Sequence, residues 1–258
     1  MNPHIQTLDA EVAVNGKQLL GGENGNNGGN VFDLVRDLVY APQAWQTAEA
    51  LVKTEAYHVN MALHPDDWFT WRSGIKAPCY CDCRHLNAHA EARVQITEAL
   101  TEAVRHTFPN ASLVVGMATA GISWARGVAD SLRLPLAYVR SSAKNHGVGG
   151  MVECSPPVGA KAVLIDDLAA SGDSLKTAMQ VLADEAQIQT VGIQTIVNWG
   201  FPAMRKNLAG TPVKALTSFP YILTHALAQS RISDNDMVEL MAFYQNPKTH
   251  VWSRMTKH

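Results

Sequence analysis

Residues 88–210 contain short apolar runs separated by segments in which apolar residues recur at helical spacing. The runs occupy residues 112–118, 136–140, 162–166 and 191–199. In a helix expected over 174–186, the residues on one face are Leu175, Ala178, Met179 and Leu182. This alternation predicts an α/β fold whose parallel sheet is covered by helices on both faces. In such folds ligands bind beyond the carboxyl ends of the strands.

The segments on either side of this core predict a different organisation. Residues 1–30 are rich in Gly and Asn and offer little apolar surface to bury, so we expect a flexible tail. Helical spacing up to about Ala56 predicts two short helices. WFTWRSG (68–74) and CYCDCR (79–84) then predict the strands of a β-rich hairpin or flap. The segment after residue 210 is expected to be mostly helical. We therefore expect one domain over 31–258, divided into N-terminal helices and flap (31–87), α/β core (88–210) and C-terminal helical segment (211–258).

Composition and charge narrow the class of protein without indicating a partner. The 258 residues are 47% hydrophobic and 17% charged, enough for one sizeable core. A formal net charge of -2 with interspersed signs gives no basic stripe for nucleic acid and no polybasic membrane patch. The opening residues lack the features of a signal peptide, and no stretch approaches the roughly 18 apolar residues of a spanning helix. We therefore expect a soluble cytoplasmic protein.

Three of the four cysteines, Cys79, Cys81 and Cys83, alternate along the chain and would share one face of an extended strand. That spacing suits a single tetrahedral zinc ion poorly, and the sequence contains no CxxC pair. We interpret them as small apolar residues that stay reduced, in preference to a metal site or a disulfide.

The segment AVLIDDLAASGDS, residues 162–174, carries the strongest chemical signal. Asp166 and Asp167 come at the end of an apolar strand, and small residues then lead into a helix expected to begin near Ser174. Unpaired amides at a helix start can hold a phosphate, while adjacent carboxylates can accept hydrogen bonds from vicinal ribose hydroxyls. An ordinary strand-to-helix connection with a capping serine is the alternative, but it does not explain the two aspartates. Neither GxxxxGK[ST] nor GxGxxG occurs.

This segment resembles the phosphoribosyl diphosphate (PRPP) signature of type I phosphoribosyltransferases. The surrounding chain, over most of residues 65–255, is similar to orotate phosphoribosyltransferases of the Gram-positive type. The other blocks that carry the resemblance are FTWRSGIKAPCYCDCR (69–84), GMATAGI (116–122), YVRSSAKNHGVGG (138–150) and NWGFPAMRKNLAG (198–210). The resemblance implies a parallel sheet flanked by helices with an N-terminal β-rich hood or flap.

The resemblance also implies roles for individual residues. Asp166 and Asp167 would hold the ribose hydroxyls, and the 5-phosphate would be bound by Leu168, Ala169, Ala170, Ser171, Gly172, Asp173 and Ser174. Catalytic contacts to the diphosphate would come from Arg140, Lys144 and His146. The remaining PRPP contacts implied are Arg72, Thr119, Ala120 and Gly121, and the orotate contacts are Ala170, Tyr80 and Lys76.

The reaction implied joins orotate and PRPP to give orotidine 5-phosphate and diphosphate, in UMP biosynthesis. Cations on a closing loop would stabilise the negative charge that develops on the leaving diphosphate. Mg²⁺ would be the cofactor, held mainly by PRPP and not by a protein metal site. In the family the loop at 140–150 closes over the neighbouring subunit's site, so a homodimer is implied.

Three positions depart from the family pattern. Ala170 stands where a hydroxyl usually contacts orotate, and Asp173 replaces a glycine, so its carboxylate would oppose a phosphate unless it points to solvent. Trp199 occupies a position where some members have an arginine. Two hypotheses follow: an orotate phosphoribosyltransferase, or a PRPP-binding derivative that uses another base or acts as a regulator. The set of Arg140, Lys144 and His146 favours the enzyme, since a sensor needs no leaving-group catalysis.

Overall fold

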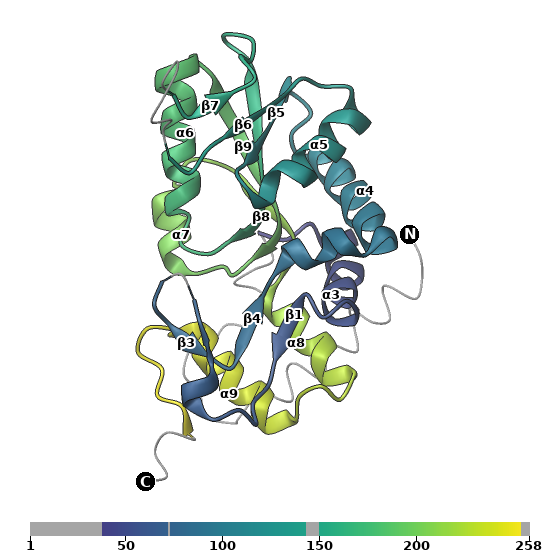
Figure 1. Ribbon diagram of the computed structural model, residues 1–258, viewed down its shortest axis with the longest axis vertical. Helices are drawn as coiled ribbons and strands as arrows, with labels where there is room; N and C mark the ends of the chain where they lie inside the picture. Colours follow the sequence, from purple (N-terminus) through teal and green to yellow (C-terminus); the bar gives the residue numbers. More distant parts are fainter. Residues whose placement is uncertain (1–37, 72, 143–149, 254–258) are drawn as a thin grey trace, which may run out of the picture.

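A computed structural model describes residues 38–71, 73–142 and 150–253 (Figure 1). Its centre is a six-stranded sheet in the order β10-β9-β8-β5-β6-β7. Neighbouring strands run parallel except β7, which pairs antiparallel with β6. The strands are β5 (Leu113–Met117), β6 (Leu136–Val139), β7 (Val152–Glu153), β8 (Lys161–Ala169), β9 (Gln189–Asn198) and β10 (Val213–Ser218). The predicted α/β fold with a parallel sheet is confirmed.

Alternate residues of each strand point to opposite faces of the sheet, and the residues on both faces are apolar. Helices therefore cover both faces. Val114, Val163 and Ile165 face α3 (Ala44–Lys53), α4 (Ala90–Thr107) and α5 (Ala120–Leu132). Val115 and Leu164 face the other way, towards α6 (Asp173–Ala186) and α7 (Pro202–Asn207). Figure 1 shows these two helix layers on either side of the sheet. None of the helices in the described ranges has the length and apolar character needed to cross a membrane.

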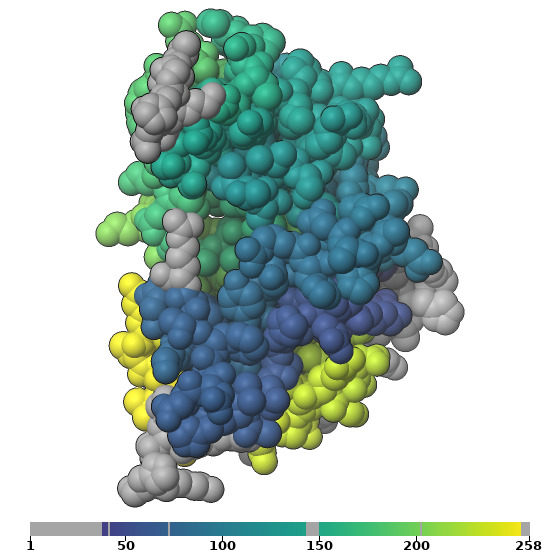
Figure 2. Space-filling view, viewed as in Figure 1, coloured from purple at the N-terminus to yellow at the C-terminus, as the bar shows by residue number. Residues whose placement is uncertain are grey.

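The hood consists of two small antiparallel sheets packed beside the C-terminal helices. β1 (Tyr57–Val59) pairs with β4 (Cys79–Cys81), and β2 (Phe69–Thr70) pairs with β3 (Lys76–Ala77). In Figure 2 the blue hood lies against the teal and green core, with yellow C-terminal residues along one side. The C-terminal helices are α8 (Phe219–Ala228) and α9 (Asp234–Gln245), and the 3-10 turns are η1 (Ala41–Gln43), η2 (Pro65–Asp67) and η3 (Cys83–Ala88).

The hood pairing corrects the predicted hairpin. Residues 68–74 do begin a hairpin, but their partner is Lys76–Ala77 and not the segment 79–84. Pro78 follows that short strand and has no N–H to donate, so the ladder ends there. The next segment pairs instead with β1, a strand that the sequence pattern did not predict.

The C-terminal segment is also less helical than expected, because it begins with β10 at the sheet edge. Lys, Ala and Leu in this strand have a good helix propensity, but pairing with β9 and burial override it.

Pairing with β10 also changes the end of the first of the two predicted N-terminal helices. Its last residues are extended, since the Tyr40 N–H donates to the Ala215 carbonyl at 2.7 Å. Residues 31–37 and the predicted tail at 1–30 lie outside the described residues; α3 matches the second helix.

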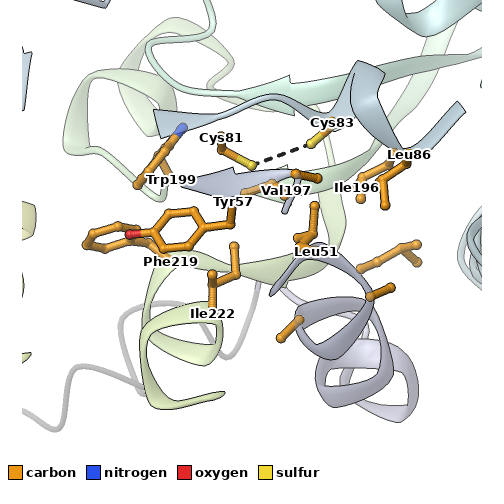
Figure 3. Packing of buried hydrophobic residues seen from close by; sticks show 14 of the residues in the cluster. Leu51, Tyr57, Cys81, Cys83, Leu86, Ile196, Val197, Trp199, Phe219 and Ile222 are labelled. Carbon is orange, nitrogen blue, oxygen red and sulfur yellow. Dashed lines mark hydrogen bonds between the residues drawn. The ribbon is translucent and has the colours of Figure 1, made fainter. Parts of the chain in front are cut away.

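The hood and the sheet share one apolar cluster, which Figure 3 shows from close by. Tyr57 of β1 packs edge-on against Phe219 of α8, with ring centroids 6.3 Å apart. Trp199, which follows β9, packs against Phe219 at 4.6 Å and against Trp71 of the hairpin at 4.9 Å. Trp199 is 3% exposed. The hood is therefore held against the carboxyl end of the sheet by buried aromatic rings.

Candidate active site

Asp166 and Asp167 lie near the carboxyl end of β8, where pairing with one neighbouring strand has stopped and pairing with the other continues. Pairing with β5 stops at Gly116 opposite Ile165, whereas pairing with β9 continues to Ala169 opposite Asn198. The two aspartates are therefore beyond the β5 ladder but still held by β9. The Asp167 N–H donates to Oδ1 of Asp166 at 2.9 Å, which orients the Asp166 carboxyl group.

The electrostatics of this pair are unfavourable without a ligand. Burial, and then the charge of Asp167, raises the pKa of Asp166 well above its ordinary value of 3.8. Burial also raises the pKa of Asp167, although the hydrogen bond with Asp166 and the charge of Arg84 act in the opposite direction. Carboxylates held in this way have unused acceptor capacity, which hydroxyl donors such as those of a ribose would satisfy.

Replacing Asp166 by asparagine is expected to raise the Tm of the ligand-free protein at pH 7. A raised folded-state pKa means that the ionised carboxyl destabilises the folded state, and this penalty declines once pH falls below that pKa and is lost near the ordinary value of 3.8. The gain should therefore shrink towards pH 4; each kcal/mol corresponds to about 2–4 °C in a chain of this size. Calorimetric scans across pH 4–8 measure it, with the exposed Asp184→Asn as control. A lower Tm for Asp166→Asn at pH 7 would contradict the prediction.

The segment after the acids turns into α6, which begins at Asp173, one residue before the expected start. Gly172 precedes the helix with φ +79°, a left-handed conformation that favours glycine. The first-turn N–H groups of α6 have no acceptor within the helix, which leaves them available for an anion. The side chain of Asp173 is exposed, and its Oδ2 accepts a hydrogen bond from the Ser171 hydroxyl at 2.6 Å.

The N-terminus of a second helix, α5, which follows β5, also lies close to the two aspartates. The predicted turn of Thr119, Ala120 and Gly121 forms the beginning of α5. A Cβ on Gly121 would lie 2.4 Å from the Ile165 carbonyl oxygen and 3.2 Å from the Asp166 Cα. The absence of a side chain at Gly121 therefore allows α5 to begin directly against the strand that carries the acids.

Arg140 follows β6, the neighbour of β5 on the side away from β8. Its Nη1 is 3.7 Å from Oε1 of Glu153 and is buried without a hydrogen-bond partner. Glu185 of α6 accepts hydrogen bonds from the Met151 N–H at 2.8 Å and the Val152 N–H at 3.2 Å, where the chain returns to the sheet. The predicted residues Arg72, Lys144 and His146 lie outside the described residues.

The predicted orotate residues lie on the hood. Lys76 of β3 is exposed, and Tyr80 of β4 is half-buried with its ring stacked on Phe69 at 5.6 Å. Tyr80 faces away from Cys79 and Cys81, which point into the core. Asp82, Cys83 and Arg84, which follow β4, interact electrostatically with Asp167. The pKa of Cys83 is raised by a hydrogen bond with Cys81 and by burial, and further by the charge of Asp167.

The three hood cysteines are buried free thiols, with the Sγ atoms of Cys81 and Cys83 3.6 Å apart (Figure 3). Cys79 and Cys81 share the inner face of β4 as predicted, but Cys83 has already entered η3. Over the described ranges, no three His, Cys, Asp or Glu side chains gather in a way that could hold a metal ion.

Sequence reasoning missed one residue of this site, Asn207 at the end of α7. Its side-chain amide donates to the Ser171 carbonyl at 2.9 Å and to Asp173 Oδ1 at 2.8 Å. The contact joins residues more than 30 positions apart, so no local pattern indicates it. The signal available was Asp173 itself, a carboxylate that needs a partner.

Comparisons with known proteins agree with this geometry. The phosphoribosyl transferase domain family matches residues 85–211. The orotate phosphoribosyltransferase of Listeria monocytogenes serotype 4b (strain F2365) is 38% identical over 205 residues, 79% of this chain and 96% of that protein. The orotate phosphoribosyltransferase of Bacillus subtilis (strain 168) is 35% identical over 192 residues, 74% of this chain and 88% of that protein.

A solved structure extends the similarity to the backbone. The crystal structure of orotate phosphoribosyltransferase from Aeropyrum pernix has 27% sequence identity and a TM-score of 0.60 over 69% of this chain and 96% of that one. This chain is therefore similar to that protein in both sequence and backbone fold. With identities of 35–38% over most of the relatives' length, the chain belongs to the orotate phosphoribosyltransferase family.

Proposed function

We propose that this protein transfers the phosphoribosyl group of PRPP to orotate, giving orotidine 5-phosphate and diphosphate in UMP biosynthesis. The observation that carries the proposal is the half-buried pair Asp166 and Asp167 beside the start of α6. Paired acceptors next to a helix N-terminus match the two halves of a ribose 5-phosphate. The names of the relatives add orotate as the acceptor base.

Binding of the sugar divides between the strand end and the loop. Asp166 and Asp167 accept hydrogen bonds from the ribose hydroxyls, which offsets the cost of keeping two carboxylates close together. The N–H groups of the segment Leu168 to Ser174 bind the 5-phosphate. The start of α5, at Thr119 to Gly121, lies against the same strand and lines the diphosphate.

Catalysis depends on charge at the departing diphosphate. Positive charge develops on the sugar as the bond from C1 to the diphosphate breaks, and negative charge accumulates on the leaving group. Arg140 has a buried Nη1 that makes no hydrogen bond, although Glu153 lies 3.7 Å away, and an anion could accept one from it. Lys144 and His146 are assigned to the same task from the family pattern, and Arg72 is assigned to PRPP binding. The ring nitrogen of orotate is readily deprotonated, so the reaction needs no strong general base.

Orotate is assigned to Ala170 of the loop and to Tyr80 and Lys76 of the hood. Ala170 is half-buried against the apolar cluster and brings no hydroxyl to the base. A transferase for another base is therefore the second candidate.

Mg²⁺ fits the chemistry of this site, because carboxylate oxygens are ligands that it prefers and the substrate brings the diphosphate oxygens. The diphosphate would hold the ion, with Asp166 and Asp167 as the nearest hard donors of the strand end. When bound, Mg²⁺ would neutralise part of the leaving group's charge. A homodimer in which the loop at 140–150 closes over the partner's site completes the proposal, together with a cytoplasmic location.

Incubation with PRPP and Mg²⁺ is expected to consume orotate and leave uracil, hypoxanthine and adenine unchanged. Chelation of Mg²⁺ should abolish turnover, and added Mg²⁺ should restore it, because the leaving group's charge is otherwise unshielded. Chromatography of the nucleotide product provides the measurement. Transfer to one of the other bases with orotate untouched would favour the second candidate, and PRPP binding without any transfer would favour a regulator.

A further inference from the structure

A negative side chain occupies the first position of α6, within the segment proposed to bind the 5-phosphate. An aspartate at a helix start interacts favourably with the helix dipole, but it repels a phosphate bound at the same amides. Asp173 is exposed, so nothing in its own burial fixes where the carboxylate points. Its hydrogen bonds therefore decide whether it obstructs the phosphate.

Both oxygens of this carboxylate are occupied. Oδ1 accepts from the Asn207 amide at 2.8 Å, and Oδ2 accepts from the Ser171 hydroxyl at 2.6 Å. The same Asn207 amide also donates to the Ser171 carbonyl at 2.9 Å. One half-buried amide thus bonds the loop backbone and the carboxylate that follows it.

The helix that carries Asn207 is itself packed onto the loop. A Cβ on Gly172 would lie 3.0 Å from Leu208 Cδ1 and 3.3 Å from Met204 Cγ. Met204 and Leu208 are buried in the cluster beneath α6. Figure 1 shows α7 directly below α6 at the end of β8. The Asn207 backbone is therefore held by apolar packing, and its side chain acts from a fixed position.

We propose that Asn207 is a positioning residue that holds the Asp173 carboxylate on the α7 side of the loop, away from the bound 5-phosphate. The inference rests on the proposed function, because it presumes a phosphate at the start of α6. Without Asn207 the carboxylate keeps only its hydrogen bond with Ser171 of the same loop and can turn with that loop towards the phosphate, and the loop loses a backbone contact. The two residues act as a unit: Asn207 is needed because Asp173 is present.

A double-mutant cycle tests this dependence. Asn207→Ala is expected to raise the Kd for PRPP about tenfold. In an Asp173→Gly background the same substitution should change the Kd by about twofold or less, since no carboxylate remains to be held. The electrostatic part of the penalty should also decline as salt is raised, because the site is exposed. Isothermal titration with PRPP and with ribose 5-phosphate gives these constants without orotate or turnover.

The control is Gln180→Ala, which removes another amide-to-carboxylate contact on α6. Gln180 donates to Asp184 at 3.1 and 3.0 Å, beyond the first turn of the helix, and its loss should leave the Kd unchanged. Asn207→Asp keeps the side-chain volume and supplies a second fold-preserving variant, which should bind PRPP at least as weakly as Asn207→Ala.

Equal penalties for Asn207→Ala in both backgrounds, or no penalty in either, would overturn the inference. Failure of the unsubstituted protein to bind PRPP would instead overturn the proposed function. Thermal unfolding of each variant identifies a general loss of folding, which would lower the affinity of Asn207→Ala equally with and without Asp173.

Discussion

Replacing Lys144 by alanine is expected to lower kcat by a factor on the order of hundreds, with a much smaller effect on the affinity for PRPP. The reason is that a cation on the leaving diphosphate interacts most strongly when the bond to C1 is breaking. Steady-state kinetics with varied PRPP separates the two quantities. Lys161→Ala is the matched control, since Lys161 is exposed at the opposite, amino end of β8. A Lys144→Ala variant with nearly full turnover would remove this residue from catalysis.

The same variant tests whether the loop acts across a dimer. Lys144→Ala and Asp167→Ala should each be inactive alone. Mixed and re-equilibrated, they form some dimers in which one site has an intact strand end and an intact partner loop, so about a quarter of the normal activity should return. A loop that serves its own subunit would leave every site defective. Mixtures with no recovery, despite exchange of subunits, would therefore contradict the proposed arrangement.

Replacing Gly121 by alanine is expected to lower kcat/KM about a hundredfold, because displacements near 1 Å in an active site have effects of that size. The added Cβ would meet the Ile165 carbonyl at 2.4 Å, and that oxygen belongs to backbone that cannot rotate away. The start of α5 must then move from β8, and the turn proposed to line the diphosphate moves with it. Forcing extra volume into a packed contact also costs about 1–3 kcal/mol of folding free energy.

Kinetics and calorimetry on Gly121→Ala and Gly159→Ala distinguish misplacement of the site from a general loss of stability. Gly159 has φ +76° with open space around it, so alanine there adds backbone strain of about 1–2 kcal/mol away from the site. Both variants should lose stability, but only Gly121→Ala should lose activity. Similar activity in the two would show that the close approach of α5 to β8 is unimportant for the reaction.

The sheet was predictable from sequence because its strands are buried on both faces. Each of the four apolar runs became a parallel strand, since continuous burial leaves a continuous apolar signal. The position of Asp166 and Asp167 at the strand end followed from the same pattern. The pattern missed strands that lack a continuous apolar run, including β10, which is buried but contains Lys, Thr and Ser. β1 is a short hood strand, and β10 contains Lys214 and good helix formers, so pairing partners distant in sequence decide both.

The contacts within the site were less predictable than its location. Asp173 looked unfavourable for phosphate when read alone, and only the folded chain brings Asn207 to it. Trp199 was noted as a departure from an arginine, and the structure gives it a packing role between hood and sheet. Local sequence indicates which groups follow a strand. It does not indicate which distant side chain restrains them.

The buried aromatic rings between hood and sheet limit how substrates can reach the base region. Lifting the hood would separate Trp71 from Trp199 and Tyr57 from Phe219, and it would expose buried rings to water. Each large aromatic side chain buries about 150–250 Å², so such an opening would be costly on the timescale of turnover. We therefore expect the hood to act as a fixed wall and not as a hinged cover. Differences in base preference among variants should arise from the shape of that wall, while the rate of substrate entry and product release is set elsewhere in the molecule.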